Sequence, residues 1–419
     1  MRMSEQDKKA LMPVLRFPEF RSEGEWGIDL LGNEDISIFV KERVALSQLN
    51  IETYISTDNL LPDYAGVTNA SKLPPTGSFT RYKKGDVLVS NIRPYLKKVW
   101  SSDKEGACSN DVIVIRAGKR VKGNFLTFIL KNDAFINYVM IGAKGVKMPR
   151  GDLSSIKEYS VAFPGSEEQQ KIADCLSSLD ELITLQTQKR DALKAHKKGL
   201  MQQLFPAEGE TQPKLRFPEF RGKGEWEAQK IEALAKRCSG HTPNKKKPSY
   251  YNGGIKWVSL ADSNKLDNGY IYATKIEIST EGLKNSSAVL HPSGTVIVSR
   301  DAGVGKSAIL HSEMAVSQHF IAWVCNETKL SNWFLYYILQ ILKPVFENIA
   351  VGSTIKTIGL PYFKELCISI PSLTEQQKIA DCLSSLDTLI TAQTQKIDAL
   401  KFHKKGLMQQ LFPQQELDQ

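Results

Sequence analysis

The sequence predicts an α+β protein in which two related mixed α/β domains are separated by two long antiparallel helices with pseudo-twofold symmetry. Residues 167–206 and 374–413 lie 207 positions apart and match at 35 of 40 aligned positions. A shorter repeat opens each half, PVLRFPEFRSEGEW at 13–26 and PKLRFPEFRGKGEW at 213–226. The segments between the short and long repeats look far less alike. This pattern is expected where one kind of partner is met twice and two different targets are met once each.

The repeats divide the 419-residue chain into four parts. We expect a first α/β domain at 13–165, a central long helix at 166–206, a second α/β domain at 213–372 and a C-terminal long helix at 373–413. A domain of about 150 residues is long enough to bury a core of its own.

The two domains share one plan. GDVLVS at 85–90 aligns with GTVIVS at 294–299, and on this alignment Lys97 falls on Lys306. Short runs of β-branched residues such as these are typical of strands. We therefore expect one scaffold that carries different loops in the two domains.

Each domain is also expected to contain a buried apolar helix, at 124–141 in the first domain and at 331–348 in the second. Pro344 predicts an interruption of the second helix, because proline lacks the amide hydrogen that a helix interior uses. Strands and helices together indicate a mixed α/β core in each domain.

The long repeats predict helices, because residues 167–205 contain no proline and only one glycine. Their apolar side chains recur every seven positions, which is typical of a coiled-coil seam. Leu176, Leu182 and Ile183 are expected to widen this apolar stripe in the first copy. The seam positions expected at the interface of the helix pair are Ile172, Leu179, Gln186, Leu193, Leu200, Ile379, Leu386, Gln393, Leu400 and Leu407.

One seam position is glutamine in both copies, Gln186 and Gln393. If the helices pack antiparallel, we expect these two side chains to meet near the pseudo-twofold axis. A polar pair in an apolar seam costs stability but fixes register and orientation.

The start of each long helix fits a capping box. Ser166 is followed by Gln169, and Ser372 is followed by Glu375. In this motif the two side chains satisfy backbone amides that the first helical turn leaves free.

Basic and aromatic residues gather in the expected loops. The first domain has NIRPYLKK at 91–98 and GAKGVKMPR at 142–150, and the second has HTPNKKKPSYY at 241–251, SRDAGVGKS at 299–307 and GSTIKT at 352–357. Any one of these could be a solvated turn, but loops at matching positions favour DNA, because lysine and arginine bind phosphates and arginine reads base edges. The candidate DNA-binding residues are Arg93, Tyr95, Lys97, Lys98, Lys144, Lys147, Arg150, Lys245, Lys246, Lys247, Arg300, Lys306 and Lys356.

Composition is ordinary for a folded protein, with 41% hydrophobic and 24% charged residues. The net charge of +9 weakly indicates an anionic partner such as nucleic acid. The six cysteines include no C-x-x-C pair, which favours a reducing compartment over a zinc cluster or disulfide framework. Residues 1–13 show no apolar signal-peptide core, and no apolar run is long enough to span a membrane. We therefore expect a cytoplasmic protein without membrane contact.

GVGKS at 303–307 imitates a nucleotide-binding loop, but a P-loop requires glycine at position 300, where this chain has Arg300. The following AILHSEMAV alternates like a strand, whereas a P-loop opens a helix. The six histidines have no metal-ligand spacing, and no catalytic motif is evident. These observations favour a binding protein that holds no metal or cofactor of its own.

The chain as a whole resembles the specificity subunits of type I restriction–modification systems. The resemblance rests on PSLTEQQKIADCL at 371–383 and its partner copy, GDVLVSNIRPYLKK, YYNGGIKWVSLAD at 250–262 and VSQHF at 316–320. It also rests on the order domain, helix, domain, helix, and it spans nearly the whole chain.

The resemblance implies two target-recognition domains, each of which reads half of an asymmetric, bipartite site in double-stranded DNA. It implies two methyltransferase subunits that bind around the helices and methylate adenine with S-adenosylmethionine. Motor and endonuclease subunits, using ATP and magnesium, would add translocation and cleavage of unmodified DNA. The resemblance supplies no catalytic residues, so the chain itself is expected to be non-catalytic.

Two other classes remain open from the residues alone. One is a stand-alone enzyme, either a nucleotidase that uses GVGKS or a self-sufficient methyltransferase, and turnover by the purified chain would favour it. The other is a coiled-coil scaffold without a nucleic-acid role. DNA affinity that does not depend on salt would favour the scaffold, because contact with six phosphates predicts a log–log slope of about −5.

Overall fold

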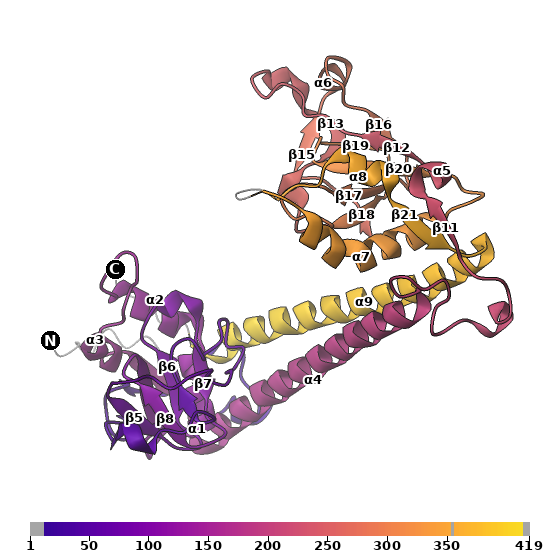
Figure 1. The fold of residues 1–419 in the computed structure, drawn as a ribbon. Coiled ribbons are helices and arrows are strands. Elements are labelled where there is room, and N and C mark those ends of the chain that lie inside the picture. The colour runs from indigo at the N-terminus through magenta and orange to yellow at the C-terminus, as the bar shows by residue number, and fades with distance from the viewer. Residues whose placement is uncertain (1–11, 353–355, 414–419) are drawn as a thin grey trace. The chain divides into compact units, whose positions relative to one another are not determined.

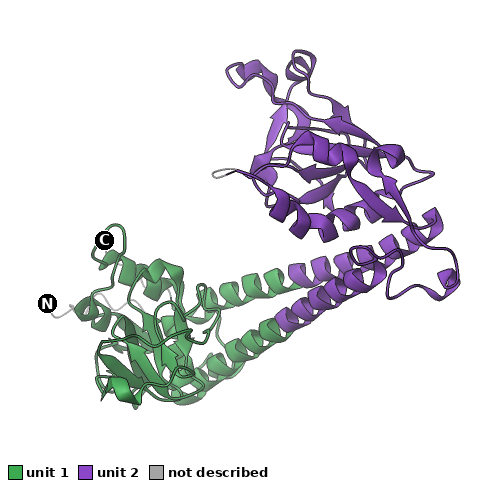
Figure 2. Cartoon of the chain, viewed as in Figure 1, with its two compact units in different colours: residues 1–185, 396–419 green, residues 186–395 purple. Residues whose placement is uncertain are grey.

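The computed structural model describes residues 12–352 and 356–413, which form two compact units (Figure 1, Figure 2). Unit 1 comprises residues 1–185 and 396–419, and unit 2 comprises residues 186–395. Residues 1–11, where the sequence shows no signal-peptide core, lie outside the described part. Each unit groups one α/β domain with half of each long helix.

The long repeats form α4 (Ser166–Leu204) and α9 (Leu373–Leu411), each of 39 residues (Figure 1). In unit 1, Lys404 Nζ of α9 lies 2.6 Å from a carboxylate oxygen of Asp180 of α4. In unit 2, Lys197 Nζ of α4 lies 2.6 Å from a carboxylate oxygen of Asp387 of α9. In unit 1, Ile172 of α4 shares a core with Leu411 of α9, and in unit 2 Gln186 of α4 contacts Gln393 of α9. Residue numbers thus rise along α4 as they fall along α9, so the helix halves are antiparallel within each unit, as predicted. None of the helices in the described residues is both long and apolar enough to cross a membrane.

The domain of unit 1 contains two four-stranded sheets and one strand pair. The first sheet has the order β2 (Ser37–Phe39), β9 (Val112–Ala117), β6 (Val87–Ser90) and β7 (Val99–Ser101). The second has the order β3 (Arg43–Val44), β5 (Phe79–Tyr82), β8 (Gly106–Ser109) and β4 (Tyr54–Ile55). The pair is β1 (Gly27–Leu30) with β10 (Ser160–Phe163), and the domain helices are α1 (Gly123–Leu130), α2 (Asp133–Ile141) and α3 (Leu153–Lys157).

The domain of unit 2 repeats this plan with one more strand in its first sheet. Its first sheet has the order β12 (Ala235–Ser239), β20 (Phe320–Cys325), β17 (Val296–Ser299), β18 (Ser307–Leu310) and β14 (Tyr270–Ile271). Its second has the order β15 (Ile276–Ile278), β13 (Tyr251–Val258), β19 (Met314–Val316) and β16 (Leu290–His291). The strand pair is β11 (Glu227–Lys230) with β21 (Cys367–Ile370), and the helices are α5 (Ile231–Leu234), α6 (Thr280–Lys284), α7 (Asn332–Ile349) and α8 (Leu360–Glu365). The predicted common plan is thus confirmed.

The C-terminal end of each long helix is anchored in a domain core by aromatic rings. In unit 1, Phe412 stacks on Phe125 with ring centroids 5.4 Å apart and meets Trp26 edge-on. The same arrangement in unit 2 involves Phe205, Phe334 and Trp226. Aromatic burial of this kind fixes the helix ends to the domains.

Two details of the predicted domain helices are wrong. The helix expected at 124–141 is divided into α1 and α2, because the Asn132 side chain accepts a hydrogen bond from the amide of Ala134 and caps a new helix. The interruption expected at Pro344 does not occur, since α7 continues through it. Burial of the apolar face of α7 offsets the lost backbone hydrogen bond.

Candidate nucleic-acid interface

The basic segments that follow β6 and α2 in unit 1 meet at the ends of strands. The amide of Arg93 donates to the carbonyl of Pro149 at 2.8 Å, and Ile92 forms an isolated β-bridge with Arg150. Arg93 has a left-handed φ of 51°, which is uncommon for a residue with a side chain. The structure therefore brings two of the predicted basic segments into one surface.

The segments that follow β17 and α7 in unit 2 meet in the same way. Asp301 forms an isolated β-bridge with Thr357, and the amide of Ile358 donates to the carbonyl of Arg300 at 3.0 Å. Residues 353–355 of the predicted segment 352–357 lie outside the described part of the chain.

Matched backbone contacts relate the two surfaces position by position. The amide of Asn91 donates to the carbonyl of Asp111 at 2.8 Å, and the amide of Arg300 donates to the carbonyl of His319 at 2.9 Å. We refer to these positions, together with the two β-bridges, as the strand-end site. Its corresponding residues are Asn91 and Arg300, Ile92 and Asp301, Asp111 and His319, and Arg150 and Thr357.

The structure corrects one detail of the sequence alignment. The amide of Ser90 donates to the carbonyl of Lys98 at 3.0 Å, and the amide of Ser299 donates to that of Lys306 at 2.8 Å. Lys306 therefore corresponds to Lys98 and not to Lys97, because the loop in unit 2 is one residue shorter.

Lys98 and Lys306 also hold their loops in place. Nζ of Lys98 donates to the carbonyl of Thr57 at 2.6 Å, and Nζ of Lys306 donates to the carbonyl of Ser263 at 3.0 Å. Each acceptor lies in the segment that follows a strand paired in parallel within its sheet, β4 in unit 1 and β13 in unit 2. Both ammonium groups therefore bind backbone carbonyls of their own domain.

Other candidates differ in how freely they face solvent. Tyr95 is 48% exposed. Among the candidates in the described residues, the exposed cations without a side-chain partner are Arg93, Lys147, Lys245, Lys246 and Lys356. Intramolecular pairs are formed by Lys97 with Asp133 at 2.6 Å, Lys144 with Asp152 at 3.1 Å, Arg150 with Asp111 at 2.8 Å, Lys247 with the Tyr250 hydroxyl at 3.1 Å, and Arg300 with the carbonyl of Ile358 at 3.2 Å. The sequence did not identify Asp111, Asp133, Asp152 or His319 as candidates, because only clusters of lysine and arginine indicated DNA binding.

A pocket of 440 Å³ in unit 2 lies beside the loop that imitates a P-loop. Lys306, Lys343 and Lys356 line it together with Glu347, so its lining is net positive. Strand β18 begins directly after Lys306, where a P-loop would begin a helix. Within the described residues, no group of three or more His, Cys, Asp or Glu side chains is placed to hold a metal ion.

Gln186 and Gln393 contact each other, as expected from the sequence. Nε2 of Gln393 donates to Oε1 of Gln186 at 2.7 Å and to its backbone carbonyl at 3.1 Å. Gln393 is only 7% exposed, so this polar pair is part of the seam in unit 2.

The other seam candidates fall into two groups. Ile172 and Ile379 are buried in the domain cores, and Leu407 and Leu200 pack against those cores. The half-buried remainder are Leu179, Leu193, Leu386 and Leu400. Leu182, which was expected to widen the stripe, is 36% exposed instead, because the neighbouring Ile183 takes the inward position.

In each unit, the short repeat that opens the domain binds the start of one long helix and the end of the other. In unit 1, Arg16 donates to both carboxylate oxygens of Glu168 at the start of α4, at 2.8 and 2.7 Å. The amide of Leu15 donates to the carbonyl of Gln410 near the end of α9. The corresponding contacts in unit 2 join Arg216 to Glu375 and Leu215 to Gln203.

The predicted capping boxes are wrong, because their side chains are bound elsewhere. Gln169 accepts from the amide of Lys122 and donates to the carbonyl of Arg120, both at 2.9 Å. Glu375 binds Arg216 with both oxygens. These side chains tie each helix to its domain instead of closing its first turn.

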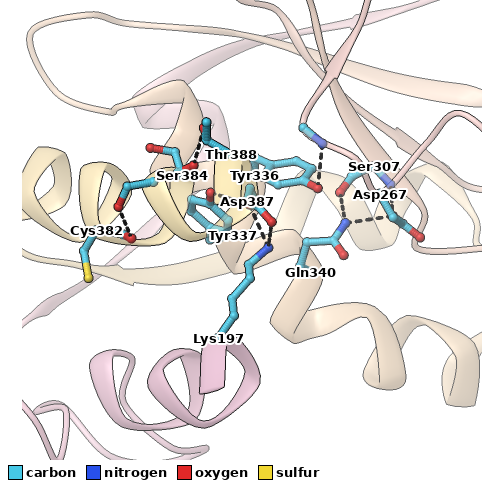
Figure 3. A network of polar contacts seen from close by, with 12 residues as sticks. Lys197, Asp267, Ser307, Tyr336, Tyr337, Gln340, Cys382, Ser384, Asp387 and Thr388 are labelled. Carbon is cyan, nitrogen blue, oxygen red and sulfur yellow. Dashed lines mark hydrogen bonds and ion pairs between the residues drawn. The ribbon is translucent and has the colours of Figure 1, made fainter. Parts of the chain in front are cut away.

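A polar network in unit 2 extends from the helix pair along α7 (Figure 3). Asp387 of α9 accepts hydrogen bonds from Lys197 of α4 at 2.6 Å and from the hydroxyl of Tyr337 at 2.8 Å. Burial and then the charge of Asp387 raise the pKa of Tyr337, which keeps this hydroxyl a donor. One turn further along α7, Gln340 donates to Ser307, the last residue of the basic segment 299–307.

Unit 1 has an ionic link of its own between helix and loop. Asp133, at the start of α2, pairs with Lys97 of the basic loop at 2.6 Å and with Lys405 of α9 at 3.4 Å. Burial acts to raise the pKa of Asp133, but the two lysines outweigh it and the pKa is lowered. In both units the helix pair is thus connected to the loops by polar contacts.

Comparison with known proteins agrees with this architecture. The family described as "Type I restriction modification DNA specificity domain" matches residues 50–195 and 223–401. The type I restriction enzyme MjaVIII specificity subunit of Methanocaldococcus jannaschii is 23% identical over 322 residues, which cover 73% of each chain. The HindI specificity subunit of Haemophilus influenzae is 21% identical over 410 residues, which cover 81% of this chain and 88% of the relative.

Solved structures show the same fold. The type I restriction-modification system S subunit from M. genitalium has a TM-score of 0.61 at 14% identity, over 97% of this chain and all of that one. A chain from a study of complex assembly and conformational transition of the type I R-M system has a TM-score of 0.57 at 19% identity, over 93% of this chain and 97% of that one. Because the family match extends over more than half of the chain and over both domains, the chain belongs to the type I restriction–modification DNA specificity family.

Proposed function

We propose that this specificity subunit reads an asymmetric, bipartite site in double-stranded DNA, with one half-site for each domain. The recognition domains are residues 13–165 and 213–372. The observation that carries the proposal is the strand-end site, where one backbone arrangement presents different side chains in the two units. Two domains that share a scaffold but differ in their surface residues can recognise two different half-sites.

The duplicated helices, residues 166–206 and 373–413, are proposed as docking surfaces for two methyltransferase subunits. Their sequences match at 35 of 40 positions, so two identical partners would meet nearly identical surfaces. The helices would also set the spacing of the half-sites. Catalysis belongs to the partners in this proposal: the methyltransferase subunits use S-adenosylmethionine, and motor and endonuclease subunits use ATP and magnesium.

The predicted basic residues are proposed to bind DNA in two ways. Exposed cations without a partner in the described residues, such as Arg93 and Lys147, are suited to phosphates. Lys98 and Lys306 instead hold the loops in the shape that the DNA meets.

The direct test is to assemble the chain with methyltransferase subunits and map methylated adenines in DNA exposed to the complex. The expected pattern has two unlike short sequences separated by a fixed spacer. A continuous or palindromic pattern would contradict the proposal. Binding of the complex to DNA should also weaken steeply with salt, and a flat response would favour a scaffold without a DNA role.

A further inference from the structure

The strand-end site carries side chains of opposite hydrogen-bonding character in the two units. In unit 1, the Arg150 guanidinium is held 2.8 Å from the Asp111 carboxylate, while 56% of the Arg150 side chain remains exposed. A guanidinium has five N–H donors and no acceptor. One oxygen of Asp111 leaves most of these donors available to a ligand.

In unit 2 the carboxylate belongs to a different position of the same site. Asp301 accepts a hydrogen bond from the Thr357 hydroxyl, and its second oxygen lies 2.8 Å from Nδ1 of His319. Because a carboxylate only accepts, Nδ1 carries a hydrogen, and in this tautomer of the imidazole Nε2 is an acceptor. The His319 side chain is 32% exposed, and no residue in the described part of the chain bonds to Nε2.

We propose that the strand-end site reads one base in each half-site with opposite polarity. Arg150 donates to O6 and N7 of a guanine, which is the commonest specific contact of arginine in the major groove. His319 accepts from the exocyclic amino group of an adenine or a cytosine, the donors that the major groove offers. Asp111 and Asp301 are positioning residues that fix the orientation of the reading group. The inference rests on the proposed function, since it requires that these loops face the DNA.

Conservative variants in the complete chain, assembled with methyltransferase subunits, test this inference by the methylation pattern. Arg150→Lys keeps the charge near Asp111 but cannot donate two parallel hydrogen bonds to one base. His319→Asn keeps a donor in the place of Nδ1 but removes the Nε2 acceptor. Lys119→Ala and Lys284→Ala, exposed positions outside the basic loops, are the matched controls.

Arg150→Lys should lower the preference for guanine at one position of one half-site by about 10- to 100-fold, as expected for the loss of a bidentate contact. His319→Asn should lower the preference for adenine or cytosine at one position of the other half-site by about 10-fold. The controls should keep the wild-type pattern.

An unchanged methylation pattern in both variants, with methylation retained, would overturn the assignment of Arg150 and His319 as base-reading residues. Relaxation of both half-sites by a single variant would overturn it as well. A wild-type pattern without two unlike halves would instead overturn the proposed function, and this inference with it.

Discussion

At the scale of single residues, the structure separates groups that maintain the architecture from groups that are available to DNA. The Glu168 side chain is 1% exposed, and Arg16 engages both of its oxygens. Lys98 and Lys306 are similarly committed to backbone carbonyls. Charge alone therefore does not identify a DNA contact in this chain.

Arg16→Ala is expected to lower the free energy of unfolding by about 3–5 kcal/mol, because it leaves a buried carboxylate without its partner. Denaturant unfolding followed by circular dichroism measures the change. Lys171→Ala is the matched control, since it removes a cation from a surface pair with Glu19 and should have a much smaller effect. Equal effects of the two substitutions would contradict a stabilising role for Arg16.

Lys97→Ala and Lys306→Ala are each expected to weaken DNA binding by the assembled complex. Lys97→Ala removes an ion pair to Asp133, and Lys306→Ala releases the loop from Ser263, so both should act through the position of the loop. Titration of labelled DNA at constant salt measures the affinity. Unchanged affinity would show that these loops face away from the DNA.

At the scale of elements, the seam of the helix pair combines apolar packing with a few polar contacts. Gln186 and Gln393 pair with each other, and Lys197 and Lys404 reach aspartates of the opposite helix. Polar contacts of this kind specify register more than they add stability.

Replacing Gln186 and Gln393 together by leucine should raise the thermal unfolding midpoint, because an apolar pair suits the seam better. Gln393→Leu alone should be less stable than the double variant, since it leaves the side-chain oxygen of the half-buried Gln186 without its donor. Calorimetry of the three chains tests this. A double variant less stable than both the wild type and Gln393→Leu would show that the polar pair is itself stabilising.

Phe402 is 81% exposed on α9, whereas the corresponding residue of α4 is Ala195. If methyltransferase subunits dock on the helices, Phe402→Ala should weaken the binding of one of the two copies, by up to about 3 kcal/mol for a ring that becomes fully buried. Native mass spectrometry across a titration measures both steps. Equal weakening of both steps, or of neither, would contradict an unequal pair of docking surfaces.

At the scale of the whole molecule, duplication made the architecture predictable. Repeats at 167–206 and 374–413 revealed two like helices, and matched strands revealed two like domains. The basic loops were also found, because lysine and arginine cluster in sequence. The division of the helix expected at 124–141 was not predicted, because the apolar run hides the capping role of Asn132.

The strand-end site could not be predicted, because its members come from separate loops. Asp111 and Arg150 meet only after the sheet forms, as do Asp301, His319 and Thr357. A loop that is one residue shorter in unit 2 also shifts the sequence alignment. Tertiary folding, and not local pattern, brings these groups together.

Exchange of residues 227–372 for the corresponding domain of another family member tests the central claim most directly. Methylated adenines would be mapped for the exchanged and the original chain, each assembled with the same methyltransferase subunits. Modular reading predicts that one half of the recognised sequence changes while the other half and the spacer stay the same. A change in both halves would contradict the division of recognition between two domains.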